Sequence, residues 1–212
     1  MKRLTKLTVL SVCLLAALCA AARAQSKDKA DPPDKRFENS GAAPLYDAAK
    51  DETKVSMFPI GLMPRRDQGA MLTFLGLAMG ASRPLEGVSL TVHFAYPGKA
   101  FAAPRQVTLR VFSTNRGERR FADGDGLVAT ADGESLAVGA ATVSSKKYQA
   151  NVSKGVAEFV DETLEATMAV EDFNRLAAAK KAEVKVGAAS WTLNESQLKA
   201  LRRLARVING SK

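Results

Sequence analysis

The stretch Val88-Ser-Leu-Thr-Val-His-Phe-Ala-Tyr96 alternates apolar and polar side chains without a break. Neighbouring side chains of a β-strand point to opposite faces of a sheet, so this alternation predicts a strand with one buried face. Pro97-Gly98 follows directly and ends the strand. A half-buried strand needs partners, and the pattern of those partners decides the fold class.

Further strands are predicted on both sides of this segment. The range 107–111 repeats the alternation, and Asp132-Gly133 favours a tight hairpin turn between strands at 127–131 and 135–140. We also expect strands at 54–60, 71–79 and 156–170, the last one broken or bent around Asp161-Glu162. Short strands at this density, separated by Gly, Pro and Asp turns, predict an antiparallel β-sandwich or open barrel.

The C-terminal quarter changes to a helical period. A short helix is expected over 171–180, with acidic residues at its start, followed by a hairpin around Gly187-Ala188. Asn194 and Gln197 form a capping-box pattern for a last helix that ends at Asn209-Gly210. We therefore predict an α+β fold, mostly β, with a short helix, a hairpin and a C-terminal amphipathic helix.

Residues 1–24 have the pattern of a cleavable signal peptide. A positively charged start precedes an apolar run at 7–22 and the cleavage motif Ala22-Arg23-Ala24. The run has about 16 apolar residues, fewer than the ~20 that cross a bilayer, so we expect export to the periplasm or the extracellular space. Both cysteines, Cys13 and Cys19, lie in this segment, and the mature chain is therefore expected to contain neither thiol nor disulfide.

The mature chain is predicted to consist of a spacer and one domain. Residues 25–45 are expected to be a disordered spacer, because the stretch 25–44 offers one large apolar residue, Phe37, for burial. Residues 46–212 are expected to form a single β-rich domain. Four positive charges of the +9 total leave with the signal, so +5 remains. From Arg175 onward nine basic residues accompany two acidic ones, which places the basicity at the C-terminal end.

The last helix carries the best candidate site. At about 100° per residue its leucines cover one side, together with Ala205 and Ile208. The opposite side carries four basic residues: Lys199, Arg202, Arg203 and Arg206. They predict contact with an anionic lipid or a cell-envelope polymer, and the alternative is a solvated face on a helix that docks through its leucines. No aromatic residue lies between these cations, so nucleic acid is not expected as a partner.

Two neighbouring motifs suggest ligands of other kinds. Asp123-Gly-Asp-Gly126 has the spacing of the first positions of a calcium loop but lacks the later ligands, so a β-turn is the preferred interpretation. Arg116, Arg119 and Arg120 lie beside it. They are suited to hold an anion or a carboxylate, although we expect a solvated loop.

No catalytic constellation is apparent. His93, the only histidine, falls on the polar face of its strand, with no nucleophile to serve. Ser144–Lys147 fits S-x-x-K, yet no S-D-N or K-T-G element follows. Motifs for nucleotide binding or for a nucleophile elbow are absent from the sequence. We expect no cofactor, no metal and no catalytic residue.

Carboxylate pairs leave one enzymatic alternative open. Glu158 with Asp161, or Glu162 with Glu165, have the residue types of a glycosidase, although such residues are more often solvent-facing charges. The leading hypothesis is an exported, non-enzymatic binding or interaction protein. The alternatives are an extracytoplasmic hydrolase that uses carboxylates and a structural component of the cell envelope.

The C-terminal segment resembles a known group of proteins. Phe173-Asn-Arg-Leu-Ala-Ala-Ala179, Trp191-Thr-Leu193 and Gln197-Leu-Lys-Ala-Leu201 are similar to the end of a group of secreted bacterial proteins. In that group an F-x-x-L-A-x-A helix precedes a hairpin and an L-x-x-x-Q-L-x-x-L helix. Phe94-Ala-Tyr-Pro-Gly-Lys99 is similar to an earlier part of the same group. The resemblance implies a shared fold and an extracytoplasmic location, and it transfers no activity, ligand or site.

Overall fold

The computed structural model describes residues 35–63, 86–152 and 155–210. The chain divides into two compact units, 1–35 and 36–212, and the fold described below is that of the second. The predicted signal peptide at 1–24, the first ten residues of the predicted spacer at 25–45 and the strand expected at 71–79 lie outside the described residues.

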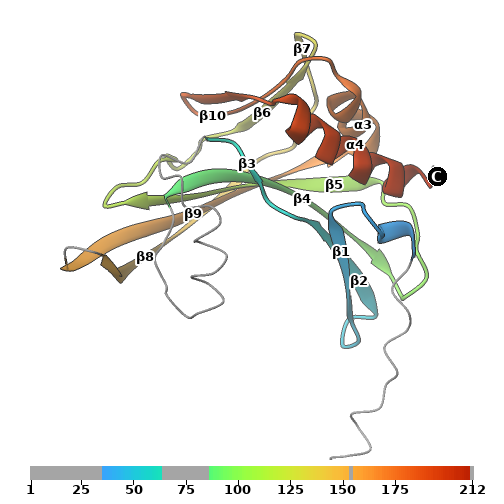
Figure 1. Ribbon diagram of the computed structural model, residues 1–212, viewed down its shortest axis with the longest axis horizontal. Helices are drawn as coiled ribbons and strands as arrows, with labels where there is room; N and C mark the ends of the chain where they lie inside the picture. The colour runs from blue at the N-terminus through green and yellow to red at the C-terminus, as the bar shows by residue number, and fades with distance from the viewer. Residues whose placement is uncertain (1–34, 64–85, 153–154, 211–212) are drawn as a thin grey trace, which may run out of the picture. The chain divides into compact units, whose positions relative to one another are not determined.

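The larger of two antiparallel sheets has seven strands (Figure 1). They are β1 (Ala42–Asp47), β2 (Glu52–Met57), β3 (Ile60–Gly61), β4 (Gly87–Pro97), β5 (Gln106–Arg116), β8 (Thr142–Val152) and β9 (Gly155–Ala169). The spatial order is β1-β2-β4-β5-β9-β8, and β3 pairs with β4. Every second residue of β4 from Val88 to Tyr96 is buried, which confirms the alternation read from the sequence.

The smaller sheet has four strands in the order β11-β10-β6-β7. They are β6 (Leu127–Ala131), β7 (Glu134–Ser135), β10 (Ala182–Val186) and β11 (Ala189–Thr192). Asp132-Gly133 makes the predicted tight turn, with φ angles of 52° and 91°. The sequence predicts a strand over 135–140. This prediction is wrong beyond Ser135, because the chain crosses to β9 after that residue. There Val138 bridges Met168, and the Gly139 amide donates to the Thr167 carbonyl.

Two helices complete the fold, α3 (Val170–Ala178) and α4 (Glu195–Asn209). The predicted capping box of α4 is confirmed. The Gln197 amide donates to Asn194 Oδ1 at 3.0 Å, and the Asn194 amide donates to Gln197 Oε1 at 2.6 Å. Gly210 ends the helix in the left-handed conformation, with φ of 65°. The sequence therefore specifies both ends of α4.

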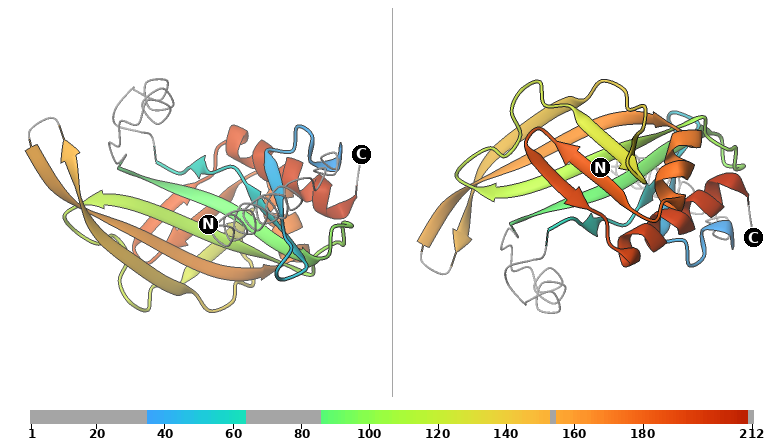
Figure 2. Two further views of the ribbon diagram at one scale, coloured as in Figure 1. Left: turned by 90° about the horizontal axis from the view of Figure 1, so that it is seen from below. Right: turned by 90° about the horizontal axis from the view of Figure 1, so that it is seen from above.

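The helices and the small sheet cover the same face of the large sheet (Figures 1 and 2). One apolar cluster joins these layers and includes Leu109 and Leu164 of the large sheet, Val184 of the small sheet, Phe173 of α3 and Leu201 of α4. The α+β, mostly β, sandwich-like class predicted from the sequence is confirmed. Among the described residues no element covers the other face of the large sheet, which is a common arrangement for antiparallel sheets.

Regular structure begins before Tyr46, the predicted start of the domain. A short 3-10 helix, η1 (Lys35–Phe37), precedes β1, and Phe37 is only 6% exposed. The Phe37 ring packs edge-on against Phe101 at 6.2 Å between centroids, and Ser40 Oγ donates to the Phe37 carbonyl at 2.7 Å. The spacer expected for residues 25–45 is therefore ordered from Lys35 on. Phe37 and the edge strand β1 fix this segment. The average composition of residues 25–45 indicates neither feature.

Candidate functional site

Three of the four predicted basic residues form an exposed row on α4. Lys199, Arg203 and Arg206 are exposed, and none makes a hydrogen bond or ion pair with another described residue. Their spacings of four and three residues place them on one stripe of the helix, about 6 Å and about 4.5 Å apart along its axis. We call these three residues the α4 stripe.

Arg202 does not belong to this exposed row. Its Nε and Nη2 atoms donate to the carbonyls of Ala177 and Ala179 at 3.1 and 3.2 Å, and its Nη1 lies 2.6 Å from Oε1 of Glu195. The last carbonyls of a helix lack partners within the helix, and a cation is favoured there by the helix dipole. The sequence groups Arg202 with the other three cations, whereas its guanidinium joins the end of α3 to α4.

The opposite side of α4 holds the stripe in a fixed orientation. Its six buried residues are Leu198, Leu201, Leu204, Ala205, Val207 and Ile208. At the C-terminal end, Asn174 of α3 and Asn209 exchange amide hydrogen bonds of 3.2 and 3.0 Å. Near the N-terminal end, the Gln197 side-chain amide donates to the carbonyl of Gly61 in β3. Helix rotation would break these contacts, so the three cations stay on the outside.

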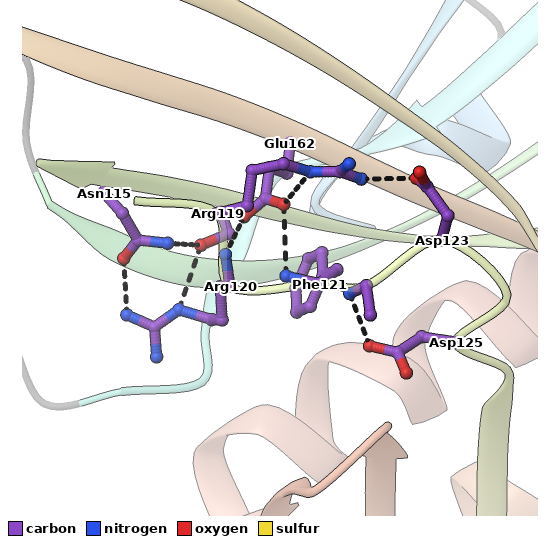
Figure 3. Close-up of polar contacts among 9 residues, drawn as sticks. Asn115, Arg119, Arg120, Phe121, Asp123, Asp125 and Glu162 are labelled. Atoms are coloured by element: carbon purple, nitrogen blue, oxygen red, sulfur yellow. Dashed lines mark hydrogen bonds and ion pairs between the residues drawn. The ribbon is translucent and has the colours of Figure 1, made fainter. Parts of the chain in front are cut away.

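A second polar cluster is built around a buried carboxylate (Figure 3). Glu162 of β9 is fully buried, and its carboxylate accepts from the amides of Arg120 and Phe121 at 2.5 and 3.1 Å. Arg119 Nε lies 3.4 Å from Oε1 of the same carboxylate. A buried charge is stable only where opposite charge and donors compensate the loss of water, and these three donors do so. Glu162 therefore anchors the loop that follows β5.

The arginines of this loop bind within the chain. Arg120 donates from Nε to Ser113 Oγ at 3.1 Å and from Nη2 to Asn115 Oδ1 at 2.6 Å. Arg119 also pairs with Asp123 at 2.7 Å, and this contact lowers the pKa of the Asp123 carboxyl. Arg119 thus contacts two carboxylates, Asp123 and Glu162, and both belong to the chain itself. The expectation of a merely solvated loop is wrong for the segment fixed by Glu162.

The proposed calcium-loop motif is engaged in turn contacts. Asp123 pairs with Arg119, and Asp125 Oδ2 accepts from the Ala122 amide at 2.8 Å (Figure 3). Gly124 between them has a positive φ of 91°. These contacts match the preferred β-turn interpretation. Within the described part of the chain, no group of three or more histidine, cysteine or acidic side chains is arranged to hold a metal.

His93 lies in the middle of the large sheet on the face opposite the core. It pairs with Ser56 of β2 and Thr108 of β5 across the ladder. Its Nδ1 atom is buried and has no hydrogen-bond partner among the described residues. Burial lowers the pKa of His93, the positive charge of Arg110 lowers it further, and Glu165 opposes this effect. These effects disfavour the charged form of the imidazole.

The carboxylates considered for glycosidase chemistry do not converge. Residues three apart on β9 lie on opposite faces of the sheet, which separates Glu158 from Asp161 and Glu162 from Glu165. Asp161 accepts from Thr114 Oγ1 at 2.8 Å and from the Tyr148 hydroxyl at 3.2 Å. The expectation that these acids face solvent is wrong for Glu162.

The sequence predicts a strand that is broken or bent around Asp161-Glu162, and β9 is not broken there. It is one strand of 15 residues, because both residues keep partners in β5 and β8. Ser144 and Lys147, the ends of the S-x-x-K match, lie on opposite faces of β8 for the same geometric reason.

The chain was compared with protein-family models, curated proteins and solved structures, and no match was found in any of the three. Among the described residues, no helix combines the length and apolarity that a membrane crossing requires.

Sequence reasoning missed the role of Glu162 although a signal was present. Val160, Leu164 and Met168 share its strand face by alternation, so the position falls in an apolar row. An acidic residue in such a row predicts a buried, paired carboxylate. The partners on the loop after β5 were not predictable, because no periodic pattern fixes a loop's path.

Proposed function

We propose that this chain is an exported, non-enzymatic binding protein that contacts an anionic surface, lipid or cell-envelope polymer, through Lys199, Arg203 and Arg206. The observation that supports the proposal most directly is the α4 stripe: three exposed cations in one row, unpaired among the described residues. Opposite charges three or four residues apart on a helix commonly pair. Glu195 lies four residues before Lys199 but pairs with Arg202, so the stripe cations have no acidic partner among the described residues.

The N-terminal sequence supports the part of the proposal that concerns export. The pattern of residues 1–24 predicts removal of the signal, and the chain that remains still carries the C-terminal basic excess. Outside the cytoplasm a basic stripe meets the anionic lipids and polymers of the cell envelope. Each cation near such a surface contributes about 1 kcal/mol, so three are sufficient for reversible, salt-sensitive binding.

Charge reversal of the stripe tests this function. The variant Lys199→Glu/Arg203→Glu/Arg206→Glu is compared with wild type for binding to vesicles containing phosphatidylglycerol and to long-chain polyphosphate. We expect wild type to bind at least one of the two probes and the variant to lose about 100-fold or more in affinity.

A matched control separates the stripe from net charge. Lys50→Glu/Lys146→Glu/Lys185→Glu changes the net charge equally at exposed positions on other elements. This control should retain binding within about threefold, because charges away from the contact are screened over about 10 Å. Equal losses in both triple variants, or no binding of wild type to either probe, would refute the proposed function.

A further inference from the structure

Among the described residues, α4 itself presents no exposed large apolar side chain beside the stripe. An interfacial helix binds a bilayer by burying its apolar face among the lipid chains. In α4 that face is already used, because all of its leucines are buried against the sheet and α3. Contact with a surface is therefore limited to charge.

The stripe is narrow, because its charged neighbours on α4 are already paired. Glu195, in the first turn of α4, has a side chain that is 74% exposed, and its carboxylate pairs with Arg202. Arg202 in turn donates to the carbonyls at the end of α3, so neither residue adds a free cation beside the row. The free positive charge on α4 is therefore a single line along the helix axis, which fits a narrow ligand better than a broad surface.

We infer that the α4 stripe takes a linear polyanion laid along the helix, and not the headgroup plane of a bilayer. This inference rests on the proposed function and selects the ligand class within it. The three cations span about 10.5 Å along the axis, so several anionic groups of one chain are held together. Arg203 and Arg206 can each bind an oxyanion through two parallel hydrogen bonds, which Lys199 cannot.

The test compares three probes on the purified chain. They are long-chain polyphosphate, orthophosphate, and vesicles of phosphatidylglycerol with phosphatidylcholine, at equal concentrations of accessible anionic groups. We expect polyphosphate to bind at least about tenfold more tightly than either other probe, because linked anions engage the stripe together. The Lys199→Glu/Arg203→Glu/Arg206→Glu variant should abolish this preference, whereas Lys50→Glu/Lys146→Glu/Lys185→Glu should retain it.

The possible failures are distinguishable. Vesicle binding as tight as polyphosphate binding, and equally sensitive to the stripe variant, would overturn this inference and leave the proposed function in place. Orthophosphate that competes as well as the polymer would overturn it too, because single anions would then suffice. Absence of binding to every probe would overturn both.

Discussion

Glu162 shows how one side chain decides the path of a loop. Its buried carboxylate accepts from two backbone amides and contacts Arg119, so the charge replaces lost water with fixed donors. Phe121, the second amide donor, is itself buried beneath the loop. The loop after β5 is thus held by the Glu162 carboxylate of β9 and by the buried side chain of Phe121.

We predict that Glu162→Gln lowers the free energy of unfolding by about 2–4 kcal/mol. The amide group removes the charge that Arg119 faces and leaves a backbone donor without its acceptor. Urea denaturation measures the change. Glu165→Gln is the control, three residues away on the same strand, because its half-exposed partner Arg110 makes a surface pair that contributes about 1 kcal/mol or less. Similar losses in both variants would contradict the role of Glu162.

His93 predicts a pH dependence of stability. Burial and Arg110 lower its pKa in the folded state below the ordinary value of 6.5. A group with a lowered folded pKa stabilises the fold above its unfolded pKa, and this contribution is lost as the pH falls through the folded value. Wild type should therefore lose more stability than His93→Gln between about pH 7.5 and about pH 5. Urea denaturation over this range checks the difference, and a gap that does not change with pH would refute it.

At the scale of elements, α3 and α4 form a unit tied by side chains. Asn174 and Asn209 join them at one end, and Arg202 reaches the last carbonyls of α3 at the other. Arg202 and Arg203 are neighbours in the sequence, yet the Arg202 side chain joins two helices and the Arg203 side chain is exposed. Helical geometry alone places both near the polar side, which is why the sequence could not separate them.

We predict that Arg202→Ala destabilises the fold by about 1–2 kcal/mol, because two carbonyls lose their donor. Arg203→Ala should change stability by no more than about 0.5 kcal/mol, since its exposed side chain makes no hydrogen bond or ion pair with a described residue. For anion binding the order should reverse, with Arg203→Ala weakening affinity more than Arg202→Ala. Thermal denaturation and binding titration of the two variants check both orders. A larger stability loss in Arg203→Ala would be incompatible with these contacts.

Elements with local signals were predictable from the sequence. β4 follows from its alternation, the β6–β7 turn from Asp132-Gly133, and α4 from Asn194, Gln197 and Gly210. Each of these features depends on residues within a few positions of one another. The continuity of β9 and the burial of Glu162 depend on partners about 40 residues away, and β1 depends on pairing with β2. The apolar row around Glu162 indicates its burial, but the identity of these distant partners leaves no local pattern.

At the scale of the whole molecule, one face of the large sheet is covered and the charge is unevenly distributed. The sequence shows the basic excess of the C-terminal end. The structure shows that three of these cations form an exposed row on α4. Three of the four candidate residues retain their predicted exposure. Arg202, the fourth, instead donates to a carbonyl at the end of α3.

The proposed export predicts that the mature chain begins at Gln25. Expressed with its own signal in a bacterial host, the protein should be recovered outside the cytoplasm with Gln25 at its N-terminus, because Ala22-Arg23-Ala24 provides small residues for cleavage. Intact-mass measurement of the recovered protein checks the cleavage site. Ala24→Leu should block processing. A full-length chain that remains in the cytoplasm would contradict the expectation.

The salt dependence of polyanion binding tests the central claim most directly. Affinity for long-chain polyphosphate is measured over a series of sodium chloride concentrations for wild type, for Lys199→Glu/Arg203→Glu/Arg206→Glu and for Lys50→Glu/Lys146→Glu/Lys185→Glu. If three stripe cations neutralise the polymer, the logarithm of the association constant should fall against the logarithm of salt with a slope of about −2. The control should keep this slope, and the stripe variant should lose measurable binding. A slope near zero for wild type, or an unchanged slope in the stripe variant, would contradict binding through α4.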